Sequence, residues 1–182
     1  MARFLILFVV ILCVLFGAQL TPWGQDYFVI PWTAGLAHFC AQLVAIFDSN
    51  AVAVGKVLRS SSNGFAVSIE AGCNGVEATL LLIAAILAFP STWRQKAWGL
   101  AFGFVAVQGL NVVRIISLYY LGQWSMTAFE WAHLYIWQAL IMLDVLIVWL
   151  IWVRRINRAP ADGAPPPPSG GLSAVTSAPL VI

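Results

Sequence analysis

Long apolar runs that carry almost no charge set the strongest limit on how this chain can fold. A helix needs about 20 apolar residues to cross the roughly 30 Å hydrocarbon core of a bilayer. Hydrophobic residues make up 62% of the chain and charged residues only 9%, whereas about a quarter of the residues in soluble domains are charged. The composition therefore predicts an all-α membrane protein. About four transmembrane helices are expected, in residues 4–20, 73–89, 97–121 and 134–153.

The few cationic residues indicate which ends of these spans lie on the same side of the membrane. Arg3 precedes the first span, Arg94 and Lys96 follow the second, and three more arginines follow the fourth, within residues 154–158. Lys and Arg collect in the cytoplasmic loops of membrane proteins. Four spans place all of these clusters on one side, so we expect both termini in the cytoplasm.

Residues 32–47 raise the question of a fifth span, which would separate Arg3 from the other cationic clusters. The apolar residues of this segment form one stripe, while His38 and Gln42 interrupt the rest and Pro31 marks the start. We therefore interpret the segment as an interfacial or re-entrant helix at the outer membrane surface.

Two other segments are predicted to lie outside the membrane. In residues 65–70, large apolar residues alternate with small or polar ones behind an Asn63-Gly64 turn, which predicts a short extracytoplasmic β-hairpin. The C-terminal stretch of Pro, Gly, Ser and Ala is typical of a disordered tail. The expected organisation is an N-terminal anchor (1–21), the interfacial helix and hairpin (22–72), a three-helix membrane core (73–155) and a cytoplasmic tail (156–182).

This topology brings three reactive side chains toward the outer ends of the spans. Cys73 begins the second span and His133 begins the fourth. Arg114 lies about 10 Å below the outer end of the third span, at 1.5 Å per residue. A guanidinium at that depth costs on the order of 2.5–3.5 kcal/mol, so it must face the bundle or snorkel outward. We expect Arg114 to approach Cys73 and Glu77, which lies one turn deeper than the thiol.

A thiol, a guanidinium and an imidazole together suit nucleophilic acyl transfer. The thiol reacts as thiolate, a form that a nearby cation favours and apolar burial opposes. Arg114 could supply the cation or bind an oxyanion, and His133 could transfer the proton. The residues alone do not assign which of the two activates Cys73. A charged Glu77 would oppose the thiolate, so we expect it to be paired with Arg114 or protonated.

Two other classes of protein fit parts of this pattern. A membrane thiol redox enzyme would need a resolving cysteine, for which Cys40 is the only outer candidate. A small ion- or proton-coupled transport subunit would use Glu77, Arg114 and Asp144 and would leave Cys73 dispensable. The sequence contains no C-x-x-C pair and no basic cluster interleaved with aromatics, so neither a metal site nor nucleic-acid binding is predicted.

Three blocks, AGCNGVEA, NVVRIISLYYLG and FEWAHLYIWQ, resemble the exosortase/archaeosortase family of membrane cysteine transpeptidases, and exosortase H most closely. The likeness covers roughly residues 60–155. The chain has fewer spans than larger members and reads Cys-Asn-Gly where many have Cys-Ser-Gly. The resemblance implies a Cys-Arg-His triad at the outer membrane face. Its members here are Cys73, Arg114 and His133, with Glu77, Asn74 and Asn111 as supporting residues.

The same resemblance implies a substrate and a location. The substrate would be a secreted protein that ends in a short motif, a transmembrane helix and a basic tail. Cleavage at the motif would leave a thioester on Cys73, and the new carboxyl end would pass to an amine acceptor that the sequence does not identify. No metal or cofactor is implied. The enzyme would lie in the bacterial inner membrane, among its lipids, with the active site on the periplasmic side.

Overall fold

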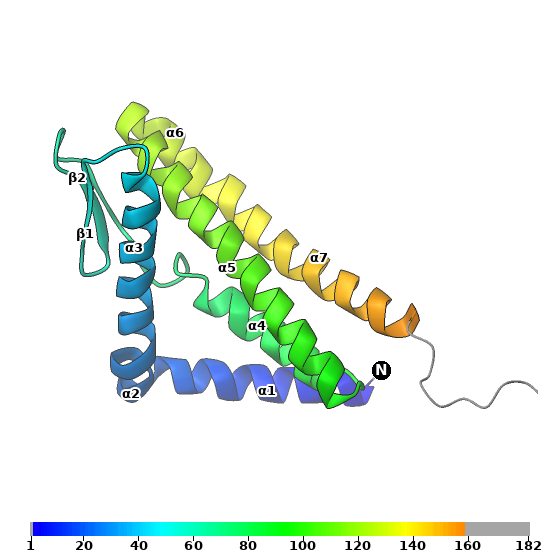
Figure 1. Ribbon diagram of the computed structural model, residues 1–182. Helices are drawn as coiled ribbons and strands as arrows, with labels where there is room; N and C mark the ends of the chain where they lie inside the picture. The colour runs from blue at the N-terminus through cyan, green and yellow to red at the C-terminus, as the bar shows by residue number, and fades with distance from the viewer. Residues whose placement is uncertain (1, 159–182) are drawn as a thin grey trace, which may run out of the picture.

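The computed structural model describes residues 2–158, most of which are helical (Figure 1). A small antiparallel sheet of β1 (Ala51–Val54), β2 (Val57–Ser60) and β3 (Ala66–Ser68) separates the first helices from the rest. The prediction of an all-α membrane protein with a small β element is confirmed. The helices are α1 (Ala2–Leu20), α2 (Pro22–Gly24), the π-helix η1 (Gln25–Val29), α3 (Ile30–Ala45), α4 (Val76–Ala88), α5 (Trp93–Trp124), α6 (Met126–Trp131), the π-helix η2 (Ala132–Ile136) and α7 (Trp137–Arg158).

Within residues 2–158, four helical stretches are long and apolar enough to cross a membrane, namely Ala2–Leu20, Pro22–Ala45, Trp93–Trp124 and Met126–Arg158. Three of them contain the spans predicted at 4–20, 97–121 and 134–153. The remaining stretch, Pro22–Ala45, corrects the sequence analysis, because the predicted interfacial helix belongs to this 24-residue stretch of spanning length. The span predicted at 73–89 contains only the 13-residue helix α4.

Helix α4 is short because the backbone stops it at both ends. Gly72 and Gly75 have positive φ values of 81° and 72°, so the chain before Val76 cannot be helical. At the other end Phe89 is extended, with φ −74° and ψ 134°, as expected for a residue that precedes a proline. Cys73 therefore lies in a loop ahead of the helix.

The first helices explain why a spanning-length α3 does not reverse the cationic clusters. Helix α1 and the α2–α3 stretch meet in an L (Figure 1). At the start of α1, Phe4 stacks with Trp149 of α7 and meets Phe89 edge-on. The second half of α3, from Leu36 onward, packs against the sheet and against Tyr119 of α5. The two helices together thus run once along the molecule, from its cationic end to its sheet end, without turning back.

The cationic end is formed by the start of α1, the α4–α5 connection and the end of α7 (Figure 1). There the indole nitrogen of Trp152 donates to the carbonyl of Gln95 at 2.9 Å, and Lys96 donates to the carbonyl of Leu87 at 2.7 Å. All the cationic clusters named above therefore gather at one end, as the charge pattern predicted. Residues 156–158 of the predicted tail belong to α7, and the rest of it lies outside the described residues.

The sheet is larger than the predicted hairpin. Strands β2 and β3 form that hairpin, with Leu58 opposite Val67. Strand β1 was not predicted, and it pairs with β2 across a turn at Gly55, whose φ is 58°. The inner side of the sheet packs with α3 and α5 in one apolar core, to which Leu58 and Ile69 contribute fully buried side chains. This core fixes the strands beside Cys73.

Candidate active site

Cys73 lies in the loop between β3 and α4, where local hydrogen bonds fix its position. Its backbone N–H donates to the carbonyl of Glu70 at 2.9 Å. One residue further, the side-chain oxygen of Asn74 accepts at 3.1 Å from the N–H of Val76, the first residue of α4. The half-buried thiol is therefore presented at the start of a helix.

Arg114 of α5 reaches this loop from within the bundle. Its side chain is only 2% exposed. Nη1 donates to the carbonyl of Gly72 at 3.1 Å, and Nη2 lies 3.3 Å from Sγ of Cys73. The planar guanidinium thus contacts the loop backbone and the thiol with two different nitrogens, an arrangement that a single ammonium group cannot reproduce.

His133 approaches the same thiol from η2. Its Nε2 lies 3.9 Å from Sγ of Cys73. The ring stacks on Phe129 of α6, with centroids 5.6 Å apart and planes 5° apart. The chain reverses before α6 at Ser125, which is extended and caps that helix through the N–H of Ala128. The structure thus brings the three predicted residues together from three separate elements.

A cavity of about 270 Å³ opens onto these three side chains. Cys73, Arg114 and His133 contribute polar groups to it, together with Ser68 and Glu70. The chain from residue 65 to residue 71 lines it continuously. The lining side chains from the second half of α5 and from α6 are apolar, namely Ile115, Leu118, Met126 and Phe129. The site is therefore a small cleft lined by the β3 segment and by apolar side chains of α5 and α6.

Asn74, predicted as a supporting residue, ties the loop to α3. It is almost fully buried. Its Nδ2 donates to the hydroxyl of Thr33 at 3.0 Å, and its carbonyl accepts from the indole nitrogen of Trp32 at 3.2 Å. The residue next to the thiol is therefore held by two side chains of α3, neither of which the sequence analysis identified.

Glu77 does not form the pair with Arg114 that was one of its two predicted states, since no ion pair joins the two residues within residues 2–158. Its Oε1 accepts instead from the N–H of Gly72 at 3.1 Å and from Nε2 of Gln19 at 3.2 Å. Glu77 and Arg114 therefore hold the same residue, Gly72, through its N–H and its carbonyl. The carboxylate contacts the loop backbone, while the guanidinium is left to contact the thiol.

Asn111 and Gln108 surround Gly75 on the far side of the loop. Asn111 is completely buried, and both atoms of its amide lack a hydrogen-bond partner among the described residues. Gln108 was not predicted, and its Nε2 donates to the carbonyl of Gly75 at 3.1 Å and to the hydroxyl of Thr79 at 2.9 Å. A glutamine in an apolar span was the only available signal, since a polar group in the membrane needs a partner.

Replacing Gly75 with alanine is expected to destabilise the fold and slow any reaction at Cys73. The new Cβ would lie 2.8 Å from Nε2 of Gln108, on a residue whose φ of 72° already disfavours side chains. The left-handed conformation alone costs about 1–2 kcal/mol in a non-glycine residue. The thermal unfolding midpoint in detergent should fall. Gly17→Ala on α1 is the matched control, because a Cβ there meets nothing within 4 Å.

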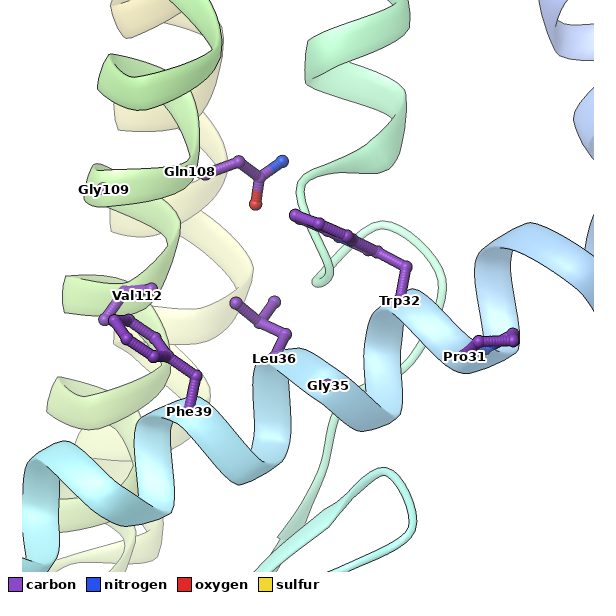
Figure 2. A pocket seen from close by; sticks show the side chains of 8 residues that line it. All are labelled: Pro31, Trp32, Gly35, Leu36, Phe39, Gln108, Gly109 and Val112. Atoms are coloured by element: carbon purple, nitrogen blue, oxygen red, sulfur yellow. The ribbon is translucent and has the colours of Figure 1, made fainter.

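A larger cavity of about 440 Å³ lies behind the loop, between α3 and α5 (Figure 2). None of its lining residues is a nucleophile, and Gln108 is the polar side chain among them. Trp32 and Gln108 line this cavity and also bond to Asn74 and Gly75, the two residues after the thiol. The larger cavity therefore borders the reactive loop without containing reactive groups. Its lining residues are Pro31, Trp32, Gly35, Leu36, Phe39, Gln108, Gly109 and Val112.

The electrostatic surroundings of Cys73 act in opposite directions. Burial raises the pKa of the thiol above its ordinary value, the charge of Arg114 lowers it, and the carboxylates of Glu77 and Glu70 raise it again. Burial is the largest of these effects, so the net pKa is raised. At neutral pH the thiolate is a minor form, and proton removal has to accompany its reaction.

Alkylation of Cys73 by iodoacetamide should therefore accelerate with pH. Below a raised pKa the thiolate fraction grows about tenfold for each pH unit, so the labelling rate should still be rising at pH 8.5. Mass spectrometry of the labelled peptide, with the enzyme in detergent between pH 6 and pH 10, measures it. A rate that is already constant at pH 7 would show that Arg114 outweighs burial.

The other candidate residues lie apart from this cluster. Cys13 is exposed on α1, Cys40 is completely buried in the core shared by α3 and the sheet, and all three cysteines are free thiols. Asp144 of α7 has one carboxylate oxygen that is buried without a partner, and no hydrogen bond within the described chain joins it to Glu77 or Arg114. Neither a redox pair nor a continuous ion path is therefore formed among these side chains.

The apolar helices and the cluster of thiol, guanidinium and imidazole define a multi-pass membrane protein with the groups of a cysteine enzyme. Comparison with protein families matches residues 2–149 to the transmembrane exosortases, and the chain belongs to that family. Membership indicates a membrane enzyme of protein sorting. The match begins at residue 2, so it also includes α1 and α3, beyond the three blocks noted in the sequence. No curated protein and no solved structure matches the chain.

Proposed function

We propose that this exosortase is a cysteine protease-transpeptidase that cleaves C-terminal sorting signals of secreted proteins. The observation that carries the proposal is the position of Sγ of Cys73, 3.3 Å from Nη2 of Arg114 and 3.9 Å from Nε2 of His133 in an open cavity. A thiol between a fixed cation and an imidazole has both requirements of a nucleophile, a stabilised anion and a proton acceptor.

The chemistry divides between the two basic residues. An arginine side chain stays protonated in proteins, so it cannot accept the thiol proton. His133 therefore takes the proton from Sγ of Cys73, which lies 3.9 Å from its Nε2. Catalytic hydrogen bonds are often long without substrate and tighten when it binds. Arg114 stabilises the thiolate and then the oxyanion that forms when sulfur attacks the scissile carbonyl.

The reaction then proceeds through an acyl-enzyme. The Sγ–C bond forms as the thiolate attacks, and the C–N bond breaks as His133 returns the proton to the leaving amine. This leaves a thioester on Cys73 and releases the C-terminal helix of the substrate. An amine acceptor attacks the thioester, gives its proton to His133, and restores the thiol when that proton returns to sulfur. No cofactor or metal is required.

The arrangement of charges supports a location and a class of substrate. The cationic clusters gather at the end of the molecule opposite the sheet (Figure 1), and Cys73 lies in the loop that joins this sheet to α4. The positive-inside tendency then places both termini in the cytoplasm and Cys73 on the periplasmic side of the bacterial inner membrane. A substrate that presents its cleavage motif at this face, followed by a transmembrane helix and a basic cytoplasmic tail, would have the same orientation as the enzyme.

Processing of a candidate substrate tests this proposal. The substrate is a secreted protein from the same genome that ends in a hydrophobic helix and a basic tail, co-expressed with the enzyme and followed by its mobility on a gel. Cys73→Ala and Cys73→Ser should abolish processing, because the first removes the thiol and the second replaces it with a hydroxyl, a much weaker nucleophile at neutral pH. Cys13→Ala and Cys40→Ala at equal membrane levels are the controls. Processing by Cys73→Ala would overturn the proposal, and loss with Cys40→Ala alone would favour the redox alternative.

A further inference from the structure

Strand β3 is an edge strand that borders the candidate active site. The strand order is β1-β2-β3, so β3 pairs with β2 on one side, and no other strand of the described chain pairs with it on the other. An edge strand presents unpaired N–H and C=O groups, which can bind an added strand. Natural proteins usually protect such an edge, so an edge left open beside a reactive thiol requires an explanation.

The hydrogen-bond register shows which backbone groups are free. The N–H of Ser60 donates to the carbonyl of Phe65 at 2.8 Å, and the N–H of Ile69 donates to the carbonyl of Lys56 at 3.0 Å. In an antiparallel pair, successive residues alternate between bonding to the partner strand and pointing away from it. The backbone groups of Ala66 and Ser68 therefore point away from β2.

The cavity follows this free edge. Residues 65–71 line it without a gap in the sequence. The face of a sheet would contribute only every second residue, because side chains alternate between the two faces. An unbroken run of lining residues indicates that the cavity extends along the backbone edge of β3 and then along the loop to Cys73.

We propose that β3 binds the extended segment of the substrate next to the scissile bond as a fourth strand of the sheet. This inference rests on the proposed function, because it assigns the recognition of the same substrate. Strand addition is a common way for proteins to bind extended peptides: backbone bonds give affinity, and pockets for alternate side chains give specificity. The residues upstream of the cleavage point are the ones bound, since those downstream enter the transmembrane helix.

The surroundings of β3 hold this edge in place. At its start, the Phe65 ring packs against Tyr119 and lies where a Cβ on Gly122 of α5 would be, 2.1 Å from the ring. At its end, Glu70 forms an ion pair with Lys56 and accepts from the hydroxyl of Ser68. An edge fixed at both ends needs little ordering before it binds a peptide, which reduces the entropic cost of binding.

The apolar wall that α5 and α6 contribute to the cavity determines which side chains fit. Leu118, Met126 and Phe129 are apolar, and the cavity volume of about 270 Å³ is below the usual range for ligand pockets. A bound strand would direct every second side chain toward this wall. The site therefore favours a short segment with small or apolar residues at alternate positions.

The first test removes one free backbone donor from the edge. Ala66→Pro eliminates an outward N–H without removing a bond to β2, and proline is tolerated on edge strands. Processing of the genome-encoded substrate described above should slow at least tenfold, while alkylation of Cys73 by iodoacetamide stays at the wild-type rate. Ala53→Pro is the matched control, since Ala53 lies on β1, outside the cavity-lining run, and by the same alternation its N–H points away from β2.

The second test maps the bound segment directly. An Ala66→Cys, Cys73→Ser, Cys13→Ala enzyme, which retains only the buried Cys40, is oxidised with copper phenanthroline against substrates carrying single cysteines upstream of the cleavage point. Cross-links at every second substrate position support strand addition. Cross-links at every third or fourth position indicate a helix, and equal or absent cross-linking also overturns the inference.

The outcomes separate this inference from the proposed function. If Cys73→Ala still processes the substrate, the proposed function fails, and the recognition argument fails with it. If processing requires Cys73 while Ala66→Pro processes normally, only strand addition is overturned. If Ala66→Pro loses both processing and alkylation, the fold has changed, and the cross-linking pattern alone decides.

Discussion

Arg114→Lys should slow substrate processing by about 100-fold or more while the protein remains folded. Lysine keeps the positive charge but replaces a planar fork with one ammonium group, which cannot hold the carbonyl of Gly72 and the sulfur of Cys73 together. Removing one preorganised donor from an oxyanion site costs about 10²–10³ in rate. Single-turnover processing by the purified variant in detergent measures the effect.

A second measurement distinguishes this loss from a general disturbance of the bundle. If Arg114 stabilises the thiolate directly, alkylation of Cys73 in Arg114→Lys should shift to higher pH, because a more distant cation opposes burial less well. Arg59→Lys, an exposed change on β2, should leave rate and pH profile unaltered. A wild-type rate in Arg114→Lys would mean that a point charge is sufficient and that the fork geometry has no role.

Spans whose position depends on apolar composition were predicted correctly. The helix whose start depends on backbone conformation was not. Hydropathy identified α1, α5 and α7, because an apolar run of that length has few alternatives to a membrane helix. It also counted residues 73–89 as a span, although the left-handed Gly72 and Gly75 delay the start of α4. The L between α1 and α3 depends on the turn at Thr21 and Gly24, which no hydrophobic pattern indicates.

The reactive residues were predictable because ionisable groups are scarce in this chain. It has nine Lys and Arg and two His residues, so an arginine inside an apolar span and a histidine at the start of one are conspicuous. Their convergence followed from assigning depths along the spans. The structure places these groups around one sulfur.

The residues that position the loop were not predictable, because they are neutral and act through tertiary contacts. Gln108, Trp32 and Thr33 reach Asn74 and Gly75 from helices distant in the sequence. Of the two states predicted for Glu77, pairing with Arg114 was wrong for the same reason, and protonation stays a prediction. Opposite charges suggested the pair, but the N–H of Gly72 and the amide of Gln19 reach the carboxylate instead.

His133→Ala is expected to slow processing at neutral pH by about 10²–10⁴-fold, the usual contribution of a general acid–base residue. No carboxylate hydrogen-bonds the imidazole in the described part of the chain; the ring stacks on Phe129, and its Nε2 lies 3.9 Å from Sγ of Cys73. Added imidazole should restore part of the rate, since the vacated space beside the cavity can hold it. His38→Ala, exposed on α3, is the matched control.

The pH dependence of His133→Ala separates the two proton transfers assigned to this residue. Raising the pH ionises Cys73 without a base, so attack on the scissile carbonyl should recover as the pH approaches the raised pKa of the thiol. Protonation of the leaving amine does not recover in this way, because a higher pH makes protons scarcer. The variant should therefore remain slower than wild type at pH 9, and full recovery there would show that His133 acts only as a base.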